Sequence, residues 1–83
     1  MINVIQISLK AARINAGLTV VQAAEMANVH PQTLSKYEKD SSDISVSLLN
    51  KLSIIYQVPE DNIFLGKQYD LIRIITLRRK ESI

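Results

Sequence analysis

Apolar residues recur every three or four positions between residues 8 and 56, which is the period of amphipathic helices. Ser8 is a suitable N-cap for a first helix, and Gly17 can end that helix in the left-handed conformation. The apolar stripe of this helix consists of Leu9, Ala12 and Ala16. Lys10 and Arg13 lie off that stripe. The pattern therefore predicts a short first helix that packs through one face.

A second helix is predicted over residues 20–27, because Thr19 and Gln22 form a capping-box pattern at its start. The small residues of this helix, Ala23, Ala24 and Ala27, allow another helix to approach closely. Asn28 follows as a turn residue, since asparagine tolerates positive φ better than most other non-glycine residues.

A third helix is predicted from Pro31, at its first position, to about Lys39. Leu34 and Tyr37 form its inward face, because residues three apart share one side of a helix. The polar residues left on its outside are Gln32, Thr33, Ser35, Lys36 and Lys39.

A fourth helix is predicted from the N-cap Ser45 to Tyr56, and Pro59 stands beyond its end. Residues 60–62, with Glu60 and Asp61 at the positive end, are predicted to begin a short fifth helix. The next three residues, Ile63, Phe64 and Leu65, would close the core.

The two ends of the chain are ambiguous. Residues 2–7, INVIQI, alternate like a short strand, whereas residues 69–77, YDLIRIITL, fit either a strand or a helix. One hypothesis pairs the two segments as a small ribbon. The apolar segment 71–77 either covers the core or forms a dimer interface, and we favour the dimer. The basic residues 78–80 are either a frayed tail or an arm that touches DNA.

Residues 20–39 contain the most informative spacing. Ala24 lies inside one short helix, Asn28 supplies a turn, and Leu34 and Tyr37 anchor the next helix. This order of a small residue, a turn and two anchors is what a helix-turn-helix requires. The outer face of the second of these helices is left free for a ligand.

Composition excludes several classes of function. The 83 residues contain no cysteine, and His30 is the only histidine, so thiol chemistry and multi-histidine metal sites are excluded. A serine nucleophile would need a neighbouring base, and His30 is the only imidazole available, so an enzyme is not expected. We also expect no cofactor and no small-molecule ligand. The net charge of +2 leans only mildly toward anionic partners. No signal peptide or membrane span is visible, and a cytoplasmic location without membrane contact is expected.

Three stretches of the chain are informative together: ISLKAARINAGLT, AAEMANVHPQTLSKYEKD and LLNKLSIIYQVPEDNIF. They resemble the Cro- and repressor-type (XRE-like) helix-turn-helix transcriptional regulators of phages and Gram-positive bacteria. The resemblance implies an all-α, five-helix, lambda-repressor-like DNA-binding domain, whose third helix enters the major groove. We assign residues 1–66 to this domain and residues 67–83 to a C-terminal extension of uncertain structure, a possible dimerisation segment.

The resemblance also implies which residues contact double-stranded DNA. Gln32, Thr33 and Lys36 match its base-facing positions, and Thr19 and Lys39 match positions beside the phosphates. Ser35 and His30 complete the expected set, although His30 is also read as an exposed or weakly capping residue. The resemblance expects a glutamine that touches a phosphate at the start of the second helix, where this chain has Val20.

The chemistry of these residues suits DNA independently of the resemblance. A glutamine such as Gln32 binds adenine through two hydrogen bonds, and Lys36 reaches guanine or a phosphate. Thr33 offers a methyl group or a hydroxyl. Pro31 is expected to leave the amides of Gln32 and Thr33 open for a phosphate at the helix N-terminus.

The sequence thus predicts a repressor that occludes an operator through its third helix. Because the basic complement is modest, specific affinity would need a homodimer that reads half-sites about 34 Å apart. The alternative is a protein-interaction module or antitoxin with a degenerate helix-turn-helix, which Val20 and the acidic middle of the chain favour slightly. Salt separates the two hypotheses, because DNA binding weakens steeply as salt rises.

Overall fold

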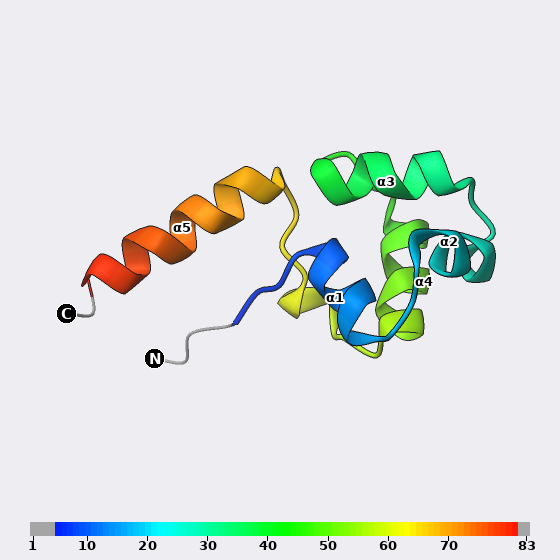
Figure 1. The fold of residues 1–83 in the computed structure, drawn as a ribbon, viewed down its shortest axis with the longest axis horizontal. Coiled ribbons are helices and arrows are strands. Elements are labelled where there is room, and N and C mark those ends of the chain that lie inside the picture. The colour runs from blue at the N-terminus through cyan, green and yellow to red at the C-terminus, as the bar shows by residue number, and fades with distance from the viewer. Residues whose placement is uncertain (1–4, 82–83) are drawn as a thin grey trace.

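A computed structural model describes residues 5–81 of the chain and is all-helical, as predicted (Figure 1). Five α-helices and one 3-10 turn follow one another in the described part of the chain. They are α1 (Leu9–Asn15), α2 (Val20–Ala27), α3 (Pro31–Lys39), α4 (Val46–Tyr56), η1 (Glu60–Asn62) and α5 (Gln68–Glu81). The first four helices agree with the predicted ones to within a residue or two at each end.

The predicted caps explain why these helices begin and end where they do. The hydroxyl of Ser8 accepts from the amide of Ala11 at 3.0 Å, and the hydroxyl of Ser45 accepts from Leu48 at 3.1 Å. The Thr19–Gln22 capping box of α2 is complete, with hydrogen bonds of 2.9 and 3.1 Å. At the far ends, Gly17 has φ 74° after α1, and Asn28 has φ 58° after α2.

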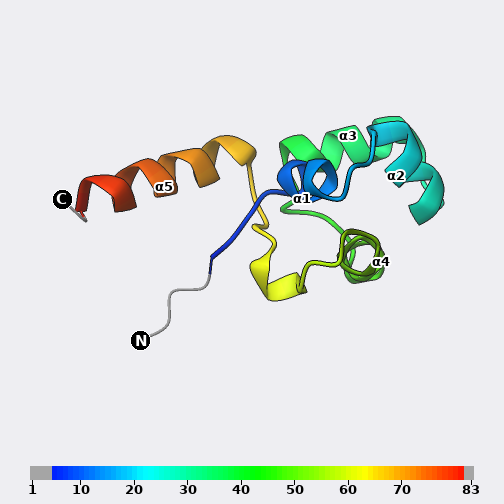
Figure 2. The same cartoon turned by 60° about the horizontal axis from the view of Figure 1, so that its bottom comes forward.

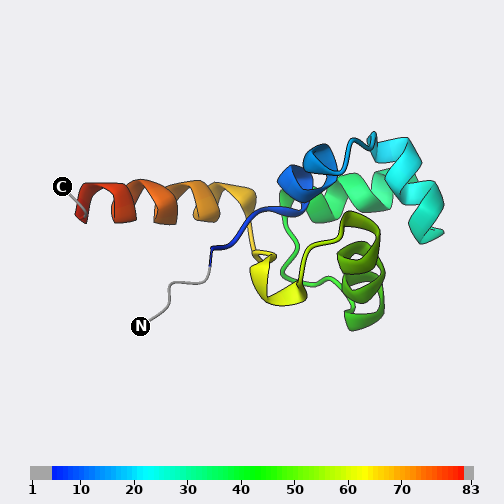
Figure 3. The same ribbon diagram turned by 90° about the horizontal axis from the view of Figure 1, so that it is seen from below.

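Small side chains bring α2 against its neighbours. Ala23, Ala24 and Ala27 are completely buried, and α2 packs on both α3 and α4. Leu34 of α3 and Leu52 of α4 are also fully buried in this core. Because the alanines of α2 are small, the three helices cross closely (Figure 3). The core therefore lies on the inner side of α3 and leaves the other side of that helix outside.

Three expectations about the inward faces need correction. Ala16 is exposed, because it is the C-cap of α1 and lies beyond the turn that packs. Arg13, placed off the apolar stripe, is buried, since it follows Leu9 by four residues and shares its face. Tyr37 is only half-buried and packs at the edge of the core.

The segment after α4 also differs from the prediction. The predicted short helix does begin at Glu60, but it is a single 3-10 turn over residues 60–62, and the chain then extends. Ile63 is buried, but Leu65 is exposed and does not close the core. Ile63 pairs instead with Ile7 in a parallel bridge, in which Ile7 donates to Asn62 at 2.8 Å.

The hypothesis that the head of the chain pairs with its tail as a two-stranded ribbon is wrong for the described residues. Residues 69–77 belong to α5, and residue 7 pairs with residue 63; residues 2–4 of the proposed head strand lie outside the described residues. The structure resolves the ambiguity of residues 69–77 in favour of the helix.

Helix α5 projects away from the other helices, and the described chain measures 43 Å in its longest direction (Figures 1 and 2). Its base is joined to the end of α3. The hydroxyl of Ser41 accepts from the amide of Gly66 at 3.0 Å, and Asp40 forms an antiparallel bridge with Lys67. Leu71 is buried at this base. No helix in the described range 5–81 is long and apolar enough to cross a membrane.

Candidate nucleic-acid interface

Helix α3 presents one buried side and one polar side. Leu34 is fully buried, whereas Gln32, Lys36 and Lys39 are exposed at a spacing that places them on one face. Ser35 is half-buried between this face and the rest of the molecule. Helix α3 lies along an edge of the molecule (Figure 1), and the exposure of Gln32, Lys36 and Lys39 shows that this polar face is open.

A buried ion pair fixes the rotation of α3. The Arg13 Nε donates to Glu38 Oε2 at 2.6 Å and its Nη2 donates to Glu38 Oε1 at 3.2 Å, while Nη1 reaches the carbonyl of Leu18 at 2.9 Å. The hydrogen bond to Glu38 raises the pKa of Arg13 above its ordinary value. A two-point contact of this kind sets direction as well as distance. It therefore holds α3 against α1 with the opposite, polar face turned outward.

The N-terminus of α3 is closed by His30. Its Nδ1 accepts from the amide of Gln32 at 3.1 Å, and its carbonyl accepts from the amide of Thr33 at 2.9 Å. The expectation that these two amides stay open for a phosphate is therefore wrong. The reading of His30 as an exposed capping residue is confirmed.

Two further predicted residues have local partners. The Lys36 ammonium lies 5.7 Å from the centre of the Tyr37 ring, a contact that steadies its long side chain. Thr19 is exposed at the start of α2, where its hydroxyl accepts from Gln22 and keeps its own proton to donate. Thr33 is half-buried beside the exposed face of α3.

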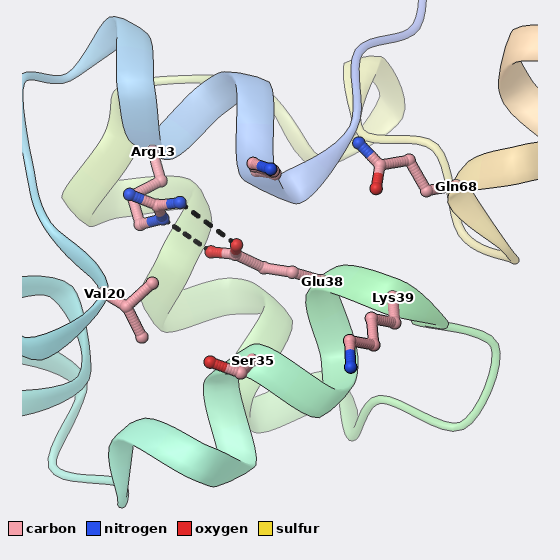
Figure 4. A pocket seen from close by; sticks show the side chains of 7 residues that line it. Arg13, Val20, Ser35, Glu38, Lys39 and Gln68 are labelled. Atoms are coloured by element: carbon pink, nitrogen blue, oxygen red, sulfur yellow. Dashed lines mark hydrogen bonds and ion pairs between the residues drawn. The ribbon is translucent and has the colours of Figure 1, made fainter.

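A pocket of about 310 Å³ lies between α1, the start of α2, α3 and the start of α5 (Figure 4). Its polar side chains come from three helices, and its apolar wall is Val20 of α2. The residues that line it are Lys10, Arg13, Val20, Ser35, Glu38, Lys39 and Gln68. The pocket brings Ser35 and Lys39 together with two residues that sequence reasoning did not select, Lys10 and Gln68.

Comparison with known proteins places this geometry in a family. A family model described as helix-turn-helix matches residues 9–63, which include α1 to α4. The chain belongs to this helix-turn-helix family. The resemblance to XRE-like regulators is thereby confirmed, and α5 lies outside the matched residues.

A curated relative supports the same family. The HTH-type transcriptional regulator ImmR of Bacillus subtilis (strain 168) is 46% identical to this helix-turn-helix protein over 59 residues. The aligned part is 71% of this chain and 46% of ImmR, so the chain spans about half the length of that relative.

Proposed function

We propose that this helix-turn-helix protein is a sequence-specific DNA-binding transcriptional regulator. The observation that supports the proposal is the exposed polar face of α3, with Gln32, Lys36 and Lys39 on one side of a helix that Arg13 and Glu38 hold in place. The name of the relative ImmR, a transcriptional regulator, agrees with it.

In this proposal α3 lies in the major groove. Gln32 reads adenine with its amide, Lys36 reaches guanine or a phosphate, and Thr33 contacts a thymine methyl or a phosphate. The residues at the rim of α3 contact the backbone and set the register of the helix on the duplex. These rim residues are Thr19, His30, Ser35 and Lys39.

The active species in the proposal is a homodimer. A single α3 reads only a few base pairs, and two copies would read half-sites about 34 Å apart. Residues 67–83 are the proposed dimerisation segment, beyond a DNA-binding domain of residues 1–66. This segment has three exposed apolar residues spaced by three on one face of α5, namely Tyr69, Ile72 and Ile75. Such a face could pack against the same face of a second copy of the chain.

The regulatory effect that we propose is repression of phage or mobile-element type. A dimer bound across an operator would exclude polymerase from the same stretch of duplex. This mechanism requires only the binding face of α3 and the dimer.

Selection of duplexes from a random-sequence pool by the purified chain tests the proposal. We expect an enriched site with two related half-sites, together with binding that weakens steeply as salt rises. Failure to enrich any sequence, with no duplex bound even at low salt, would contradict the proposal and favour the protein-interaction alternative.

A further inference from the structure

The pocket between α1, α3 and α5 has a composition that suits an anion. Three cationic side chains and one carboxylate line it, and the carboxylate of Glu38 is already paired with Arg13 (Figure 4). Lys10 and Lys39 are exposed and have no ion-pair partner among the described residues. The pocket therefore has two uncompensated ammonium groups.

Neutral donors complete the lining. Ser35 from α3 offers a hydroxyl and Gln68 from the first turn of α5 offers an amide, and both are half-buried in the pocket wall. Val20 offers no donor, so the polar groups come from α1, α3 and α5 and not from the start of α2. Two cations with hydroxyl and amide donors match the oxygens of a phosphodiester.

The position of the pocket identifies the source of the anion. Ser35 and Lys39 line the pocket and also border the exposed face of α3. A duplex docked on that face would bring its sugar-phosphate backbone along this rim. The pocket is thus continuous with the proposed DNA-reading surface.

We infer that this pocket seats one backbone phosphate of the bound duplex, held by Lys10 and Lys39 with Ser35 and Gln68 as neutral donors. The inference rests on the proposed function and extends it. It assigns DNA contacts to α1 and to the base of α5.

Salt dependence tests the role of Lys10. Binding of the selected duplex is measured over a range of salt for the unaltered chain, Lys10→Ala and the control Lys51→Ala, an exposed lysine on α4 outside the pocket. In Lys10→Ala the negative slope of log affinity against log salt is expected to become shallower by about 0.9, because one fewer phosphate is neutralised. The substitution should lower affinity for all duplexes by a similar factor, and Lys10→Arg should retain the slope. Urea unfolding midpoints establish that each variant is folded.

Gln68→Ala separates a neutral contact from a charge effect. It is expected to weaken binding without a change in slope, because no counterion is released at a neutral donor. Ethylation interference is expected to identify one phosphate in each half-site. Ethylation of that phosphate should weaken DNA binding by the unaltered chain but not by Lys10→Ala.

Two results would overturn the inference in different ways. Equal slopes for Lys10→Ala and Lys51→Ala, with salt-dependent binding intact, would exclude the phosphate seat and leave the proposed function standing. Loss of all duplex binding by the unaltered chain would remove the proposed function and the phosphate seat together.

Discussion

Arg13 and Glu38 are 25 residues apart in the chain, yet the guanidinium grips both oxygens of the carboxylate. Both side chains are about nine-tenths buried. The pair joins α1 to the last turn of α3 on the side opposite Gln32. The orientation of the candidate DNA-reading face thus depends on a contact that lies beneath it.

Removal of one partner should therefore destabilise the fold. Glu38→Ala leaves a buried guanidinium without its carboxylate, and we expect the free energy of unfolding to fall by about 3 kcal/mol. The double variant Arg13→Met with Glu38→Leu removes both charges and should regain much of that loss. Urea denaturation followed by circular dichroism measures both, and a double variant no more stable than Glu38→Ala would contradict the account.

The turn between α2 and α3 gives a second prediction. Asn28 is exposed and has φ 58°, a conformation that a Cβ disfavours unless a short polar side chain supports it. Asn28→Ala is expected to lower the free energy of unfolding by about 1 kcal/mol. Asn28→Gly should equal or exceed the unaltered chain. The same urea experiment decides, and equal stability of the alanine and glycine variants would refute the role of the turn.

Tyr56 gives the pH dependence. Burial raises the pKa of its hydroxyl to about 12, with a smaller contribution from Glu38 in the same direction. Because the unfolded chain releases this proton near its ordinary value of 10.0, the free energy of unfolding should fall as pH rises from about 10 through about 12.

Tyr56→Phe isolates this effect. The hydroxyl of Tyr56 has no hydrogen-bond partner among residues 5–81, so its removal loses no bond and should cost little at neutral pH. The alkaline loss should be smaller in the phenylalanine variant by the contribution of this one group. Unfolding midpoints of both chains at neutral and alkaline pH measure the difference. An equal fall in stability with pH for the unaltered chain and Tyr56→Phe would contradict the role of Tyr56.

Base reading by α3 predicts different effects for two exposed residues of that helix. Gln32→Ala is expected to weaken binding to the selected duplex by about 1 to 3 kcal/mol and to relax one base position. Lys39→Ala should weaken binding to every sequence alike. Titration against a panel of single-base variants measures both, and a uniform loss for Gln32→Ala would remove its base-reading role.

The exposed face of α5 predicts the state of association. Ile72 is 57% exposed, and Ile72→Asp is expected to convert a dimer into a 9.3 kDa monomer in sedimentation equilibrium. Val46→Asp is the matched control, because Val46 is an exposed apolar residue at the start of α4. An unaltered chain that is already monomeric at concentrations where DNA is bound would contradict the dimer.

Local signals account for what could be predicted. The caps Ser8, Thr19 and Ser45 and the turn residue Asn28 act within a few positions of themselves, so the sequence alone places α1 to α4. The helical period likewise places Gln32 on the outside of α3. That these outward residues bind DNA stays a prediction.

Contacts between distant positions could not be predicted in the same way. Arg13 looks like a surface residue until Glu38 is brought to it by folding. Ile7 gives no indication that its partner is Ile63 and not the isoleucines of the tail. The isoleucines in residues 69–77 suit a strand as well as a helix, so neither α5 nor Gln68 as part of the pocket could be found from periodicity.

The junction at Ser41 and Lys67, where the end of α3 meets the base of α5, has an evolutionary consequence under the proposed function. Exchange of residues on the outer face of α3 would change the bases that are recognised and leave the junction untouched. Insertion of one residue at the start of α5 would instead rotate that helix by about 100° about its axis. The apolar face of α5 would then point elsewhere, and the second protomer of the proposed dimer would bind in a different orientation. Related proteins could therefore change the base sequence of the half-site and the spacing between the two half-sites independently of each other.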